Sequence, residues 1–258
     1  MALLATTQPS LAIAPDLGLD TTYRFVGECG GGSGTAIARR VMITAKHVPG
    51  IWFEVQGRMY TAVQRFNHPS HDIAVFIFGE DLPGWYQLGA SAPVGAPVTW
   101  VGYGGIGTVN NQWQGYDIRY GNHGRHAATN VVHKKWSLFG LGPALVSMLA
   151  DQPNSASVNG DSGGAVFSNG RLVGVISYAF NETGGSRPNY GFAANNGGVP
   201  YHGSGAIDLT VPEIRQWVLQ FVRPLVIARP QSLIPFQSPT TVPWKKPLAL
   251  PFFQLRRG

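Results

Sequence analysis

Short segments rich in β-branched and aromatic residues follow one another along the first half of the sequence, with turn-forming residues between most of them. They include IWFEVQ (51–56), MYTAVQRF (59–66), DIAVFIF (72–78) and PVTWVGYG (97–104). The 34 glycines and 19 prolines among 258 residues supply many turns and leave little room for long helices. Strands at this spacing predict an all-β barrel or sandwich.

The second half keeps the β pattern with looser spacing and ends in one helix. GGAVFSNGRLVGVISY (163–178) predicts a hairpin that turns at residues 168–170. Further on, Thr210 is a candidate helix N-cap, and Glu213 lies three residues later, as in a capping box. Pro224 is expected to end this helix. Its apolar face comprises Ile214, Trp217, Val218 and Phe221.

The basic residues are concentrated at the C-terminal end of the chain. The net charge is +6, but residues 214–258 hold seven of the 19 lysines and arginines and none of the 13 acidic residues. Prolines are spread along residues 223–258, which predicts an extended tail rather than part of a core. The basic character therefore belongs to the tail and says little about what the folded part binds.

Cys29 is the only cysteine, so no intrachain disulfide can form. This fits a reducing compartment and favours an intracellular setting over secretion without deciding between them. The apolar start MALLATTQPSLAIAP lacks a basic region and is interrupted by Gln8 and Pro9, which argues against a signal peptide. The longest uncharged apolar run, WSLFGLGPALVSMLA (136–150), is too short to span a membrane.

The stretch NGDSGGAVF (159–167) places Ser162 between an aspartate and two glycines. A serine hydroxyl is a weak nucleophile near neutral pH and needs a base that a third group orients. ITAKHV places His47 after an apolar strand, and HPSHDIAV places Asp72 at the start of another. Each residue alone also has a structural explanation, as a turn serine, a surface or core histidine, and a strand cap. Their joint presence carries the inference.

These three stretches resemble the trypsin-like (chymotrypsin-fold) family of serine proteases. TAKHV stands where the family has T-A-A-H, DIAV where it has D-I-A-L, and GDSGG matches outright, in the family's order of His, Asp and Ser. The short spacing resembles the compact, disulfide-free bacterial and viral members. The resemblance covers roughly residues 22–222. It implies an all-β fold of two six-stranded antiparallel Greek-key barrels (chymotrypsin-like) with a C-terminal helix.

The resemblance divides the chain into four parts. Residues 1–21 form an N-terminal extension, 22–105 the first β-barrel, 106–222 the second β-barrel with the C-terminal helix, and 223–258 the Pro-rich basic tail. VTWVGYG (98–104) resembles the segment that closes the first barrel.

The resemblance also implies catalytic roles. Ser162 attacks the scissile carbonyl, and His47 takes its proton and later protonates the leaving amine. Asp72 accepts from the other imidazole nitrogen and fixes the tautomer. The backbone N–H groups of Gly160 and Ser162 form the oxyanion hole.

Asp161 stands where the family's zymogens pair an aspartate with a newly cut N-terminus. RFVGE (24–28) superficially resembles such a cleavage site, but a cut there would discard most of the first strand. We therefore expect no activation of this kind. An arginine such as Arg125 is the expected partner of Asp161.

The resemblance assigns Ala156 to the base of the substrate pocket, where no carboxylate is available to bind a basic side chain. Ser177, Tyr178 and Ala179 form the strand along which substrate backbone adds. Ala179 stands where the family often has glycine, and its methyl group narrows the entrance of the substrate pocket. Together these residues predict a small or medium apolar residue before the cleaved bond.

The leading hypothesis is a monomeric serine endopeptidase that acts on a protein or peptide substrate and needs no cofactor or metal. One alternative is a catalytically inactive protease-fold binding protein. Another is a viral polyprotein-processing protease whose basic tail contacts nucleic acid or membrane. The tail's basic residues are sparse, which disfavours that contact. His68 and His71, next to Asp72, are interpreted as loop residues. The other four histidines lack metal-ligand spacing: His123, His126, His133 and His202.

Overall fold

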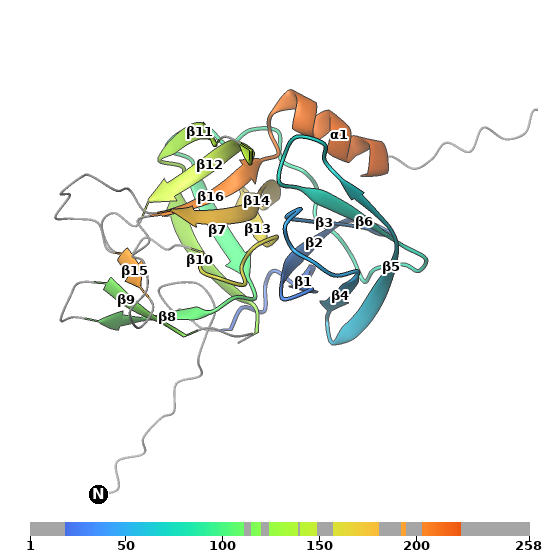
Figure 1. Cartoon of the computed structure of the whole chain (residues 1–258), viewed down its shortest axis with the longest axis horizontal. Helices are drawn as coiled ribbons and strands as arrows, with labels where there is room; N and C mark the ends of the chain where they lie inside the picture. Colours follow the sequence, from blue (N-terminus) through green and yellow to red (C-terminus); the bar gives the residue numbers. More distant parts are fainter. Residues whose placement is uncertain are drawn as a thin grey trace, which may run out of the picture. The chain divides into compact units, whose positions relative to one another are not determined.

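The computed structural model describes residues 19–110, 115–119, 124–138, 140–148, 157–180, 192–194 and 203–222. These residues form two large antiparallel sheets, a small sheet and one helix (Figure 1). The expected all-β fold with a C-terminal helix is confirmed. The predicted tail lies outside the described residues.

The first large sheet is a closed six-stranded barrel with the order β1-β2-β3-β6-β5-β4. It closes where β1 pairs with β4, with Glu28 opposite Glu54. Phe53, Phe76 and Phe78 are almost completely buried and fill its core. The strands are β1 (Val26–Cys29), β2 (Gly32–Ala38), β3 (Val41–Thr44), β4 (Trp52–Val55), β5 (Arg58–Asn67) and β6 (Ala74–Phe78).

The second large sheet has seven strands in the order β10-β7-β13-β14-β16-β12-β11. The strands are β7 (Pro97–Gly102), β10 (His126–Val131), β11 (Lys134–Leu138), β12 (Gly142–Met148), β13 (Ala165–Ser168), β14 (Arg171–Phe180) and β16 (Gly203–Asp208). A third sheet contains β8 (Ile106–Asn110), β9 (Gly115–Arg119) and β15 (Phe192–Ala194).

The seven-stranded sheet curls so that β10 meets β12. The Asn130 side-chain amide donates to the Met148 carbonyl at 3.1 Å, and the Ser147 hydroxyl donates to the Val131 carbonyl at 2.8 Å. Six strands from β10 to β12 thus approach closure, and β11 flanks them as an additional strand.

β7 lies in the second sheet, which differs from the expectation that VTWVGYG closes the first barrel. It pairs with β10 and β13. The first barrel is already closed by β1 and β4, so it has no edge for β7 to join. Trp100 of β7 is fully buried, and its indole N–H donates to Ser147 of the second sheet at 3.2 Å.

Two hairpins show how local sequence fixes a turn. The predicted hairpin of β13 and β14 is confirmed, and it turns at Asn169 and Gly170, which have φ of 50° and 71°. Two positive φ values in a two-residue loop favour such residues. The β11–β12 hairpin overlaps the apolar run 136–150, which is too short to span a membrane. Gly140 in its turn has φ of 80°, and Gly142, the first residue of β12, has φ of 109°.

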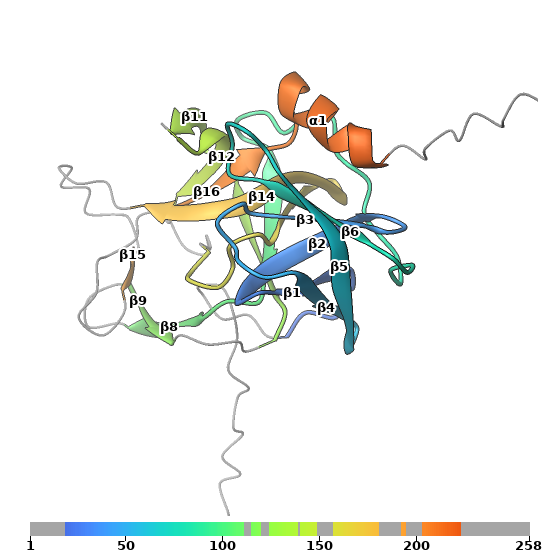
Figure 2. The ribbon, with the colours of Figure 1, turned by 45° about the vertical axis from the view of Figure 1, so that its right-hand side comes forward.

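Helix α1 (Pro212–Val222) lies over the first barrel, as Figures 1 and 2 show, although it follows the last strand of the second sheet. Its buried residues Ile214 and Val218 join the main hydrophobic core. The helix begins later than a Thr210 N-cap requires, because the Thr210 hydroxyl donates to Asp208 Oδ1 at 2.6 Å instead. No helix among the described residues is long and apolar enough to cross a membrane.

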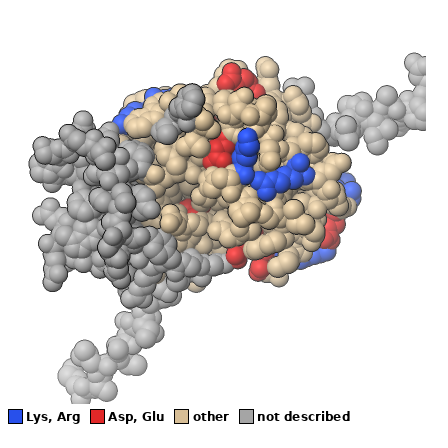
Figure 3. Space-filling model, viewed as in Figure 1, with Lys and Arg blue, Asp and Glu red and all other residues tan. Residues whose placement is uncertain are grey.

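Charged side chains are sparse on the face shown in Figure 3. Lysines, arginines and acidic residues there occur singly or in small groups among uncharged residues. This agrees with a charged fraction of only 12% in the sequence.

Candidate active site

His47 and Asp72 lie on two loops at one end of the first barrel. β3 ends at Thr44 and β6 begins at Ala74, and these two residues are paired across the sheet. His47 Nδ1 lies 2.7 Å from Asp72 Oδ2, and the His47 backbone N–H donates to Asp72 Oδ1 at 3.0 Å. The His47 side chain is 48% exposed and Asp72 only 5%. A buried carboxylate therefore holds an imidazole that remains open to solvent.

Hydrogen bonds stabilise the ionised form of Asp72. The Ser177 hydroxyl donates to Asp72 Oδ2 at 2.5 Å, and the Asp72 N–H donates to the Leu141 carbonyl at 3.0 Å. Burial opposes ionisation, but the bonds from His47 and Ser177 outweigh it and hold the pKa of Asp72 below its usual value. An ionised carboxylate only accepts hydrogen bonds, so His47 Nδ1 carries the proton and Nε2 is left as a base.

Ser162 lies half-buried on a loop that contacts the first barrel. The Ser33 N–H donates to the Ser162 carbonyl at 2.7 Å. The next residue, Gly163, has φ +84°, and a Cβ there would come within 2.1 Å of Thr44 Oγ1. The loop of Ser162 therefore lies against the strand end that leads to His47.

Gly160 packs so closely against the backbone that no side chain fits. It has φ +98°, and a Cβ there would lie 2.7 Å from Gly104 Cα. Its carbonyl accepts from the Ser33 hydroxyl at 3.1 Å, which fixes the orientation of the peptide group before Asp161. Glycine at this position leaves room for a substrate carbonyl to approach the backbone.

Asp161 is fully buried in a cradle of backbone N–H groups. Gly104 N–H donates to Oδ1 and Val158 N–H to Oδ2, each at 2.8 Å. A Cβ on Gly102 or Gly104 would come within 3 Å of the carboxylate. Burial raises the pKa of Asp161 to about 7, against the opposing effect of the two N–H bonds. The cradle fixes the residue directly before Ser162.

Arg125 is not the partner of Asp161, which corrects the expectation from the sequence. Its Nε lies 3.0 Å from Asp20 Oδ2, and a second guanidinium nitrogen donates to the Asp20 carbonyl at 2.9 Å. A third donates to the Val26 carbonyl at 3.2 Å. The arginine thus binds Asp20 and the first residue of β1, while backbone N–H groups bind Asp161 in its place.

The predicted substrate strand forms part of β14. Tyr178 pairs with Gly205 and Ala179 with Ser204 on β16, whereas the pairing with β13 ends at Val175. On the side that faces β13, residues Ser177–Ala179 are therefore not paired with that strand. Ala156 lies outside the described residues. Its neighbour Ser157 is buried, and the Ser157 N–H donates to Ser204 Oγ at 2.7 Å.

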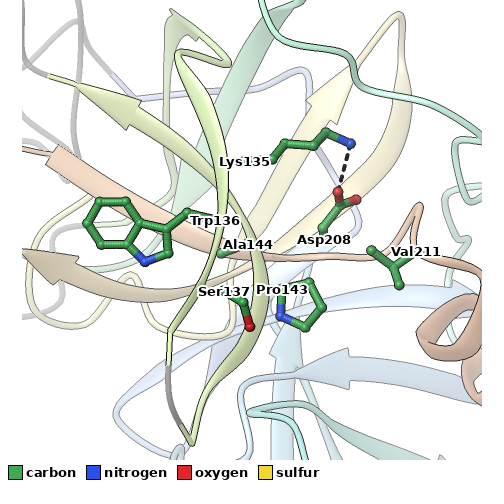
Figure 4. A pocket seen from close by; sticks show the side chains of 7 residues that line it. All are labelled: Lys135, Trp136, Ser137, Pro143, Ala144, Asp208 and Val211. Atoms are coloured by element: carbon green, nitrogen blue, oxygen red, sulfur yellow. Dashed lines mark hydrogen bonds and ion pairs between the residues drawn. The ribbon is translucent and has the colours of Figure 1, made fainter.

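A cavity of about 290 Å³ lies elsewhere on the second sheet, between β11, β12 and the start of α1 (Figure 4). Lys135 and Asp208 form an ion pair of 2.8 Å within it. None of its lining residues belongs to the predicted site. They are Lys135, Trp136, Ser137, Pro143, Ala144, Asp208 and Val211.

Ser33 is a site residue that sequence reasoning missed. It is fully buried and connects three parts of the site. Its hydroxyl donates to the Gly160 carbonyl and accepts from Tyr103 N–H at 2.9 Å, and its carbonyl accepts from Thr44 Oγ1 at 2.7 Å. The only signal was its place in the run GGGSG, which indicates a turn. Within the described part of the chain, no cluster of three potential metal ligands occurs.

A six-stranded barrel, a curled second sheet, a C-terminal helix and a histidine held by a buried aspartate together define the chymotrypsin-like class of fold. The sequence model of the trypsin family matches residues 24–196, which is more than half of the chain, so the protein belongs to the trypsin family. It is a serine protease by family, with hydrolase chemistry.

Among solved structures, one similar protein is neuropsin, a serine protease expressed in the limbic system of mouse brain. The TM-score is 0.55 at 17% sequence identity, over 78% of this chain and 96% of neuropsin. At this identity the likeness concerns the fold. A search among curated proteins gave no match.

Proposed function

We propose that the protein is a serine endopeptidase that cleaves peptide bonds through His47, Asp72 and Ser162 with an acyl-enzyme intermediate. The observation that carries the proposal is the pair of His47 and Asp72. The 2.7 Å contact leaves Nε2 as the basic nitrogen on an imidazole open to solvent. Such a base can accept the serine proton, and an ionised Asp72 then stabilises the imidazolium.

The loop of Ser162 supports a preformed oxyanion hole built from the N–H groups of Gly160 and Ser162. Bonds from Ser33 hold the carbonyls of both residues, and the Asp161 cradle fixes the residue between them. Donors that are held before the reaction need no reorganisation in the transition state.

Residues Ser177–Ala179 offer an edge to which substrate backbone can add as a strand. We expect cleavage after a small or medium apolar residue. The Tyr178 ring turns away from this edge, because it lies against Gly205 of β16, where a Cβ would come within 2.5 Å of it. Ser157 and Ser204 hydrogen-bond to each other, and neither carries a charge that could bind a basic side chain.

The competing function is an inactive binding protein on the same fold. A fluorophosphonate probe separates the two, because it reacts only with an activated serine. We expect wild type to be labelled, and S162A and H47A to remain unlabelled. S91A, at an exposed serine, is the control and should be labelled like wild type. A folded wild type that resists labelling would favour the binding protein. Cleavage of a peptide library then measures specificity.

A further inference from the structure

The loop that carries Asp72 begins with a buried histidine that the proposed chemistry does not use. His68 follows β5 and is only 8% exposed. Its N–H donates to the Ile73 carbonyl at 2.9 Å, which closes the loop around Asp72. Any change at His68 therefore acts on the segment that positions the carboxylate.

The His68 ring organises this loop through a single nitrogen. Nδ1 accepts hydrogen bonds from the backbone N–H groups of Ser70 and His71, both at 3.1 Å. A nitrogen that accepts two such bonds carries no proton, so the ring is neutral with its proton on Nε2. Asparagine and aspartate side chains bond to nearby backbone N–H groups in a comparable way.

The ring is packed between the loop and helix α1. It stacks on His71 at 4.4 Å and meets the edge of Trp217 at 4.9 Å. His71 Nε2 in turn lies 3.3 Å from Glu213 Oε1. The Lys46 ammonium donates to the His68 carbonyl at 3.1 Å and links the loop to the residue beside His47.

Three charged or titratable groups face His68. Burial lowers its pKa below the usual value, His71 and Lys46 act in the same direction, and Glu213 opposes them. The neutral ring is therefore the form that this environment stabilises at neutral pH.

We propose that His68 is a positioning residue for Asp72, and that its protonation releases the loop and adds one inactivating proton to the acid side of the pH profile. A proton on Nδ1 would point at two N–H groups that are donors themselves. Both hydrogen bonds would break, and Asp72 would lose the support that fixes its distance to His47. This inference rests on the proposed function of the triad.

Two substitutions distinguish the contribution of the Nδ1 acceptor from that of the aromatic ring. H68N keeps a side-chain oxygen that can accept the backbone N–H groups but does not titrate, and H68F keeps an aromatic ring without an acceptor. H133N is the matched control. The Nδ1 of His133 also accepts a backbone N–H, from Met148 at 3.0 Å, but it lies in the connection between β10 and β11 of the second sheet.

The experiment measures kcat and KM of the full-length variants against pH on a peptide that wild type cleaves. At pH 8 we expect H68N to keep the wild-type kcat, and H68F to lose about tenfold or more in kcat with KM unchanged. At the acid end we expect two inactivating protons in wild type and in H133N. Their kcat/KM should therefore fall by up to about a hundredfold per pH unit. H68N should fall only about tenfold per pH unit.

Equal acid-side slopes in wild type and H68N would overturn the inference, and so would an H68F variant with the wild-type kcat. A histidine 15N NMR titration of the S162A protein provides a readout that needs no activity. At neutral pH we expect the His68 Nδ1 resonance of an unprotonated acceptor. When Nδ1 becomes protonated, the amide resonances of Ser70 and His71 should move away from their hydrogen-bonded positions. A protonated Nδ1 at pH 8 would refute the mechanism even if the protein is not an active protease.

Discussion

Replacing Gly104 by alanine tests whether the backbone cradle of Asp161 controls the site. A Cβ on Gly104 would lie 2.5 Å from Asp161 N and 2.7 Å from Asn159 O, both backbone atoms. Its N–H is also one of the two donors to the Asp161 carboxylate. The methyl group therefore meets atoms that cannot rotate away, one residue before Ser162.

The size of the effect follows from these distances. The shorter contact has to lengthen by about 0.9 Å to reach the 3.4 Å at which ordinary van der Waals contact begins. Added volume in a well-packed region typically costs about 1–3 kcal/mol of stability. A misplacement of about 1 Å in a catalytic group lowers the rate by roughly a hundredfold. We therefore expect G104A to fold with reduced stability and to lose about a hundredfold in kcat.

The matched control is G79A. Neither glycine has a positive φ, and a Cβ on Gly79 would meet only Val63 Cγ1, at 3.5 Å. Thermal unfolding and peptide hydrolysis of both variants give the comparison, with G79A expected to match wild type in kcat. A G104A protein with the wild-type kcat would show that the loop of Ser162 does not depend on the cradle, and the reasoning would fail.

Three further perturbations test other contacts of the site. S33A removes the hydroxyl donor to the Gly160 carbonyl. A buried polar group without its partner costs about 1–3 kcal/mol, so we expect kcat to fall about tenfold with little change in KM. Unchanged kinetics would exclude this role for Ser33. D20A leaves Arg125, which is 12% exposed, without its carboxylate and should lower the unfolding free energy by about 3 kcal/mol in urea denaturation. Asp161 has an ordinary pKa of 3.8 and a folded pKa of about 7, so the native state binds more protons between these values, and stability should fall as pH rises through them. D161N should lack that part of the pH dependence, and parallel stability curves would contradict the pKa.

Residues whose roles depend on local sequence could be predicted. The turn at Asn169 and Gly170 follows from residues that tolerate positive φ, and the structure confirms it. His47 and Asp72 were expected together, and the pairing of β3 with β6 brings them to 2.7 Å. In both cases the prediction depends on the type of side chain at each position, which the sequence gives directly.

Features that depend on backbone groups or on distant strands could not be predicted. The partners of Asp161 are N–H groups of Gly104 and Val158, and backbone amides are present at every residue except proline. The resemblance of VTWVGYG to the segment that closes the first barrel predicts β7 there, but its partners are β10 and β13. The role of Ser33 depends on contacts with residues up to 127 positions away.

The position of helix α1 has a consequence for how the protein is made. Glu213 follows His71 by 142 residues, yet the two side chains meet, and Trp217 covers the ring of His68. A ribosome adds roughly 5–20 residues per second, so the loop of Asp72 is synthesised about 7–28 seconds before the helix that covers it. The loop of Asp72 therefore gains the contacts of helix α1 only when nearly the whole folded part has been synthesised.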